Sequence, residues 1–339
     1  MSFPELAFLE NLLEGLNGVA RTEEVARIPF GGETFPIYTI AFGSTDPEAP
    51  TLAIVGGVHG QEKIGAQVAL SYLESLAELV RWDKLTNLAL ERSRVVFMPI
   101  VNPVGIRLLR RGNGNRVDLM RNAPPVSNIP AAPLLGGQRI SPYLPWYQGP
   151  AGGPMEKESQ ALCDFMRKEV LPARTSIAVD CHSGYGTIDR LWFPYSHTTK
   201  AYPDIGEAYA LKTLLDLTYP NHVYRMEPGS QGYTISGDLW DYLFEEHRAL
   251  YAGKKRFFPV TLEMGSWLWL KKNPVQILSA MGAFNPMNQH RHRRILRRHI
   301  TLLDFFHRAV MAPEVWAFPE GEEARELRAG AEDFWFGDN

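Results

Sequence analysis

Two histidines and a glutamate lie just beyond two apolar runs of this 339-residue chain, and they are residue types that bind catalytic zinc. His59 and Glu62 belong to the segment GGVHGQE after the run 51–55, and His182 follows a second run. Either histidine alone would more simply be a core or surface residue. Together, two histidines and one glutamate are a known ligand set that leaves a fourth zinc position open for water. We therefore expect one Zn²⁺ per chain, held by His59, Glu62 and His182.

A further glutamate, Glu263, ends the buried-looking segment FFPVTLE. Burying a charge at the end of such a segment costs folding free energy unless the charge is paired, or the cost is accepted because the group acts in catalysis. Glu263 is therefore either a buried salt-bridge partner or a general base that takes a proton from zinc-bound water.

Arginine is concentrated in the segment RLLRRGNGNRVDLMRN, which follows the Asn102-Pro103 stop of another predicted strand. Attack on an amide creates an oxyanion that a cation stabilises, and a guanidinium also binds a substrate carboxylate in bidentate fashion. The alternative is that these arginines only make the surface soluble. The candidates are Arg107, Arg110, Arg111, Arg116 and Arg121.

Two more side chains stand near the expected site. Asp180, two residues before His182, either orients that histidine from behind or caps a neighbouring loop. Tyr233 belongs to the glycine-rich segment GSQGYTISG, so it is either a mobile residue over the site or an ordinary surface tyrosine.

Alternating strand and helix patterns must position these residues, and they predict an α/β fold with a largely parallel, twisted sheet. Because ligands bind beyond the carboxyl ends of such strands, the residues above should converge at one edge. We expect one domain over 1–310, with a hairpin at 23–42 inside the N-terminal segment 1–45, and an acidic tail at 311–339. Other strands are expected at 94–101, 176–180, 222–226 and 257–262, and helices at 62–80, 156–170, 203–217, 237–249 and 290–310, with a loop over 106–155.

Composition limits the function classes. With 45% hydrophobic and 22% charged residues, the chain has ample material for a core, which excludes intrinsic disorder. No apolar run approaches the length of a membrane span, and the first residues lack the basic start of a secretory signal. Two cysteines and a net charge of −3 favour a cytoplasmic protein with no nucleic-acid or membrane partner. The basic segment 290–299 is expected to pair with the acidic tail or to form a solvated helix face, and the alternative is an interaction surface, for example for nucleic acid.

At these residues the sequence resembles the zinc carboxypeptidase family. The matching motifs are His59-Gly60-Gln61-Glu62, Asn102-Pro103-Val104-Gly105, Val117-Asp118-Leu119-Met120-Arg121-Asn122 and His182-Ser183. The resemblance covers about residues 50–265 and implies a mixed sheet of about eight strands flanked by helices.

The resemblance also implies roles for single residues. Arg121 would grip the terminal carboxylate of the substrate, and Arg111, rather than Arg110, would steady the oxyanion. Arg110 and Asn122 would be further substrate-binding residues. Glu263 would be the general base, and Tyr233 the mobile tyrosine over the substrate.

One residue departs from the family pattern: Met120 stands where an asparagine usually helps to bind the substrate carboxylate, and a thioether cannot donate a hydrogen bond. The first hypothesis is a carboxypeptidase-type metallopeptidase acting on a peptide. The second is an N-acyl amino acid deacylase, similar to the aspartoacylase and succinylglutamate desuccinylase branch, which shares the zinc residues. The third is a non-catalytic zinc-binding relative.

Overall fold

A computed structural model of the protein describes residues 3–126, 131–279, 281–317 and 321–337. Eight strands form one mixed sheet in the order β1-β2-β4-β3-β5-β8-β6-β7. The strands are β1 (Arg21–Phe30), β2 (Glu33–Gly43), β3 (Thr51–Gly56), β4 (Arg94–Met98), β5 (Thr175–Ser183), β6 (Arg190–Phe193), β7 (Arg225–Pro228) and β8 (Arg256–Met264).

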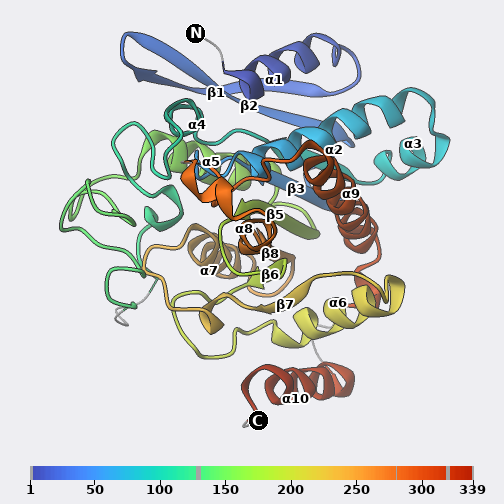
Figure 1. The fold of residues 1–339 in the computed structure, drawn as a ribbon. Coiled ribbons are helices and arrows are strands. Elements are labelled where there is room, and N and C mark those ends of the chain that lie inside the picture. The colour runs from blue at the N-terminus through green and yellow to red at the C-terminus, as the bar shows by residue number, and fades with distance from the viewer. Residues whose placement is uncertain (1–2, 127–130, 280, 318–320, 338–339) are drawn as a thin grey trace.

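Helices cover both faces of this sheet (Figure 1). α2 and α9 pack on β3 and β5 from one side, while α5 and α7 contact β1 and β8, respectively, and each other. The helices are α1 (Pro4–Glu14), α2 (Lys63–Trp82), α3 (Lys84–Leu90), α4 (Pro103–Leu108), α5 (Lys157–Glu169), α6 (Ile205–Thr218), α7 (Leu239–Tyr251), α8 (Trp267–Lys272), α9 (Gln289–Met311) and α10 (Glu322–Phe336). In the part of the chain that the structure describes, no helix is both long and apolar enough to cross a bilayer.

The middle of the sheet is parallel and buried on both faces. Every residue of β3 and of β5 is buried, as expected for parallel strands covered by helices. β4, β3, β5 and β8 run in the same direction, so their carboxyl ends meet at one edge. In the β5–β8 register His182 lies opposite Glu263, which brings the two predicted site residues onto adjacent strands.

The predicted fold class is confirmed, and most of the predicted elements are present. The 23–42 hairpin forms as β1 and β2, but it does not stand before the sheet: β2 pairs with β4 and the hairpin makes one edge. The predicted strand at 222–226 is the opposite edge strand, β7. The short elements α1, α3, β6 and α8 were not predicted, because stretches of four to eleven residues carry little periodicity of their own.

In the residues of the acidic C-terminal segment that the structure describes, no pairing with the basic segment 290–299 is present. Residues 322–336 form helix α10, which packs against α6 and buries Ala331 and Trp335. Among the described residues, no ion pair joins α10 to the arginines of α9, and Arg328 of α10 pairs with Glu332 one turn away. Arg293, Arg294 and Arg297 are exposed, which fits the expectations of a solvated helix face or an interaction surface.

A buried histidine in α9 gives the fold a testable pH dependence. His307 is buried, its Nε2 lies 2.8 Å from Ser93 Oγ, and burial with the nearby Arg308 lowers its pKa to about 4. Its pKa in the unfolded chain is about 6.5, so the unfolded state takes up a proton first as the pH falls. Wild type should therefore lose about 2 kcal/mol of unfolding free energy relative to His307→Gln between pH 7 and pH 5.

Chemical denaturation of both proteins at the two pH values measures this difference. His290→Gln, an exposed position on the same helix, is the matched control and should leave the pH dependence unchanged. Parallel pH profiles for wild type and His307→Gln would contradict the prediction.

Candidate metal centre

The turn between β3 and α2 presents the first two predicted ligands. The chain leaves β3 at Gly56 and enters α2 at Lys63, so His59 and Glu62 stand on the connecting turn. Gly57 has a φ of +66°, which an L side chain rarely adopts. At Gly60 a Cβ would lie 1.9 Å from the carbonyl carbon of Gly105, so only glycine lets the turn pack against the start of α4.

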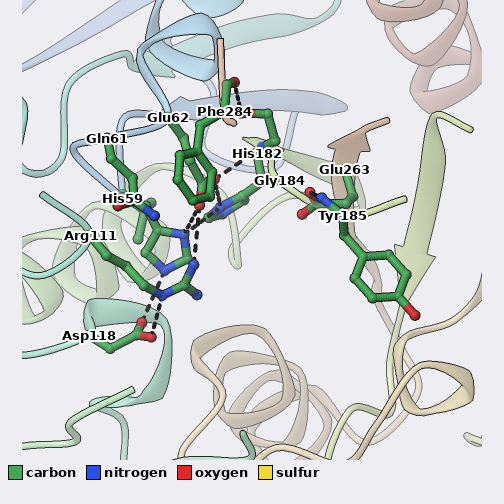
Figure 2. Close-up of polar contacts among 12 residues, drawn as sticks. His59, Gln61, Glu62, Arg111, Asp118, His182, Gly184, Tyr185, Glu263 and Phe284 are labelled. Carbon is green, nitrogen blue, oxygen red and sulfur yellow. Dashed lines mark hydrogen bonds and ion pairs between the residues drawn. The ribbon is translucent and has the colours of Figure 1, made fainter. Parts of the chain in front are cut away.

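His59, Glu62 and His182 converge in the buried space at the sheet edge, with ligand atoms all within 4.8 Å of one another. His59 Nδ1 lies 2.9 Å from Glu62 Oε1, and His182 Nδ1 lies 3.1 Å from Glu62 Oε2. Figure 2 shows the two rings and the carboxylate directed at one another. The two histidines and the carboxylate thus form one compact donor set.

The outer nitrogen of each histidine is bound to a carboxylate. His59 Nε2 donates to Asp118 Oδ1 at 3.0 Å, and His182 Nε2 donates to Asp180 Oδ2 at 2.6 Å. A carboxylate only accepts, so each neutral ring carries its proton on Nε2 and presents a lone pair at Nδ1. The Nδ1 atoms are 3.1 Å apart, and two lone pairs beside a carboxylate at that distance call for a cation between them. This donor set fits zinc.

Asp118 ties this centre to the arginine loop. Besides His59, it accepts hydrogen bonds from Arg111 Nε at 2.8 Å and from Arg121 Nη1 at 2.9 Å (Figure 2 shows the first of these). Burial disfavours the charge of Asp118, but the two guanidinium groups outweigh it and hold its pKa well below its usual range. Arg111 also donates from Nη1 to Glu62 Oε1 at 3.2 Å, so its guanidinium lies directly beside the metal ligands.

Glu263 reaches the same space from β8. It is buried, and its Oε1 accepts a hydrogen bond from the backbone N–H of Tyr185 at 2.9 Å. Its Oε2 has no hydrogen-bond partner among the residues that the structure describes. Burial, with the nearby charge of Glu62, raises the pKa of Glu263 to about 8. The carboxyl group is thus held by one oxygen and left open at the other.

A cleft of about 770 Å³ opens over the centre, and Glu62, Arg111, Tyr233 and Glu263 all line it. A smaller pocket of about 60 Å³ adjoins it and is lined by Arg121, Met120 and Tyr233, among other residues. Tyr233 stands between the two spaces. Its hydroxyl accepts a hydrogen bond from Arg121 Nη2 at 3.3 Å.

Two predicted substrate-binding residues, Arg110 and Asn122, use polar groups within the arginine loop. Arg110 donates to the carbonyl of Gly114 at 2.8 Å and stacks on Phe30, although it lines the cleft. Asn122 uses both ends of its amide inside the loop, donating to the carbonyl of Gln148 and accepting from the N–H of Glu156. Asn122 therefore organises the loop, and it does not line either cavity.

Sequence reasoning did not assign a role to some residues of the site. Asp118 belongs to the Val117–Asn122 motif, and its position between arginines in the sequence could have indicated that it pairs with them. Trp240 donates from Nε1 to Asp180 Oδ2 at 2.9 Å, and no sequence signal pointed to that contact. Of the two alternatives for Asp180, the contact with His182 is present.

Comparison with known proteins extends this picture. A family model described as "Zinc carboxypeptidase" matches residues 23–266. The chain is 28% identical over 110 residues to "Carboxypeptidase SOL1" of Arabidopsis thaliana, a match covering 31% of this chain and 22% of that protein. The curated relative is thus matched over less than a quarter of its length.

Solved structures share the fold. The crystal structure of thrombin activatable fibrinolysis inhibitor superposes with a TM-score of 0.65 at 20% identity, covering 91% of this chain and 72% of that one. The carboxypeptidase A from Helicoverpa armigera gives a TM-score of 0.59 at 16% identity, covering 100% and 75%. At these identities the likeness concerns the fold alone.

Proposed function

The chain belongs to the zinc carboxypeptidase family, and from this premise we propose that it is a zinc-dependent peptidase that hydrolyses an amide bond close to a substrate carboxylate. The observation that carries the proposal is the position of Glu263. Glu263 lines the same cleft as His59, Glu62 and Arg111, and it lines the adjoining smaller pocket together with His182. Ligands, base and cation thus surround two adjoining spaces over the metal centre.

When bound by these three ligands, zinc supplies a Lewis acid that polarises a carbonyl and makes water more acidic. The positive charge of bound zinc would favour the ionised form of Glu263, and in that form Glu263 accepts a proton at its open Oε2 from the water that attacks the scissile carbonyl carbon. As the carbon–nitrogen bond breaks, the same carboxyl group returns the proton to the leaving nitrogen. Arg111, held by Asp118 and Glu62, presents its Nη2 to the developing oxyanion.

Arg121 is the residue that we propose to recognise the substrate carboxylate. It is buried, and its side chain is fixed by Asp118, by the carbonyl of Leu135 and by Tyr233. A fixed guanidinium binds a carboxylate without losing further side-chain entropy. Met120 lies in the same pocket and offers no hydrogen bond, so Arg121 acts there without the amide that relatives are expected to provide.

A substrate panel tests the proposal. We expect hydrolysis of a peptide with a free C-terminus, and roughly a hundredfold lower kcat/KM when that terminus is amidated, because the charge-assisted pair with Arg121 is lost. The 770 Å³ cleft is much larger than a short acyl group needs, which supports a peptide over an N-acyl amino acid.

The panel therefore includes N-acetyl and N-succinyl amino acids under the same conditions. Cleavage of these compounds alone would replace the peptidase proposal with the deacylase. Cleavage of free and amidated peptides at equal rates would contradict the role of Arg121.

A further inference from the structure

The basic segment 290–299 and the segment before it form a surface that the catalytic proposal does not use. Between Met264 and Leu303 the sequence contains no Asp or Glu, but it contains seven Lys and Arg residues, although the chain as a whole has a net charge of −3. Figure 1 shows the orange segment after α8 leading into the N-terminal end of α9. Positive charge is therefore concentrated in one continuous part of the fold.

The turn after α8 exposes large apolar side chains. Val275, Ile277 and Leu278 of the 3₁₀ turn Pro274–Leu278 are 71%, 65% and 85% exposed. Gln276 between them is buried and donates to the carbonyl of Gly282 at 2.6 Å, which anchors the turn and directs its neighbours outward. Three adjacent apolar side chains at this exposure form a patch of the kind that marks an interaction site.

Exposed cations stand before and after this apolar turn along the chain. Lys271 and Lys272 end α8 immediately before it, and the exposed face of α9 carries Arg293, Arg294 and Arg297. Arg291 donates to the carbonyl of Trp269 at 3.3 Å, which ties the first turn of α9 to α8. Within the described ranges none of these five cations forms an ion pair. We call Lys271, Lys272, Val275, Ile277, Leu278, Arg293, Arg294 and Arg297 the apolar–basic surface.

The basic face of α9 has no acidic residue to balance it within the helix. The first turn of this 23-residue helix carries no acidic residue, although the partial positive charge of a helix N-terminus favours one. Arg293, Arg294 and Arg297 follow in the next two turns, and the first acidic residue of the helix is Asp304. This run of uncompensated cations fits a negatively charged partner.

We propose that the apolar–basic surface docks the protein on an anionic lipid bilayer. Exposed aliphatic side chains insert at the interface between headgroups and acyl chains, while flanking Lys and Arg bind anionic headgroups. A nucleic acid would use the cations but gain nothing from Val275, Ile277 and Leu278. The overall charge led us to expect no membrane partner, but a total of −3 hides this local concentration of positive charge.

Docking would bring the cleft close to the bilayer. Trp267, the first residue of α8, and Phe284, which precedes α9, both line the cleft over the metal centre. Bound in this way, the protein would work on substrates held at the membrane surface.

Vesicle sedimentation of the full chain tests the proposal. We expect binding to phosphatidylcholine vesicles that contain phosphatidylglycerol, no binding to phosphatidylcholine alone, and release by salt. The triple variant Arg293→Gln, Arg294→Gln, Arg297→Gln should bind roughly a hundredfold more weakly. The variant Val275→Ser, Ile277→Ser, Leu278→Ser should bind at least about tenfold more weakly. Thermal unfolding should match wild type in both, since the altered side chains are exposed.

A second exposed apolar group supplies the matched control. Leu85 and Leu88 of α3 are exposed, but the neighbouring cations Lys84 and Arg92 are accompanied by Asp83 and Glu91, so Leu85→Ser, Leu88→Ser should leave vesicle binding unchanged. Absence of binding by wild type would overturn the proposal. Full binding by the variant Val275→Ser, Ile277→Ser, Leu278→Ser would also overturn it, because the apolar side chains would then not contribute. Equally tight binding of wild type to a DNA duplex would, together with that result, indicate a nucleic-acid partner.

Discussion

Glu263→Gln is expected to lower kcat for peptide hydrolysis by roughly a factor of 10³, with KM and bound zinc nearly unchanged. Glutamine has the same shape and can still accept the hydrogen bond from the Tyr185 N–H through its carbonyl oxygen. It cannot take a proton from water at neutral pH. The change therefore removes proton transfer and leaves the ligands His59, Glu62 and His182 in place. Steady-state kinetics and elemental analysis on one preparation measure both effects.

Glu207→Gln is the matched control for this variant. Glu207 is also buried, its pKa is also raised to about 8, by burial first and then by Asp204, and it pairs with Arg256 away from the cleft. We expect full activity from it. If Glu263→Gln also kept full activity, Glu263 would not be the general base. If neither variant nor wild type hydrolysed a peptide, the hypothesis of a non-catalytic zinc-binding relative would be supported.

His182→Ala is expected to abolish stoichiometric zinc binding and to lower hydrolysis to the background rate, a loss of roughly 10⁴-fold or more. The variant removes one of three ligands and leaves Asp180 without its hydrogen bond to an imidazole. His59→Ala should behave in the same way. Elemental analysis after dialysis, with and without added zinc, measures the metal content.

Asp180→Asn should produce a smaller and more informative loss. An amide oxygen can still accept from His182 Nε2, but without the negative charge that makes the imidazole a stronger ligand. Zinc affinity is expected to fall roughly 10- to 100-fold, with activity restored by excess zinc. His222→Ala, which removes a histidine paired with Asp216 outside the centre, should retain one zinc per chain. A folded wild-type protein that takes up no zinc would contradict the whole metal-centre proposal.

Local sequence was sufficient for the elements that carry strong periodicity. The apolar stretches 52–55 and 177–179 predict strands buried on both faces, and both lie in the middle of the parallel sheet. Because parallel strands end at one edge, the residues after them were expected to meet there. That rule places His59, Glu62, His182 and Glu263 at one edge of the sheet from the sequence alone.

Other features depended on contacts between distant segments. Asp118 binds His59 across 59 residues, and Trp240 binds Asp180 across 60, and neither pairing leaves a local pattern in the sequence. Asn122 and Arg110 match or adjoin the family motif, yet the loop uses their polar groups for its own backbone. A motif gives residue types and order, but hydrogen-bond partners depend on how the loop folds back.

The sequence by itself determined the fold class and the chemistry of the ligand set, because periodicity and residue type are local properties. Only the tertiary structure decided which face each side chain presents. Asp118 and Asp180 orient the imidazoles of His59 and His182 through their Nε2 atoms. The acidic segment packs as α10 on α6, and the turn before α9 exposes its apolar side chains. Burial and pairing over long separations are set by the packing of the whole chain, which no window of residues contains.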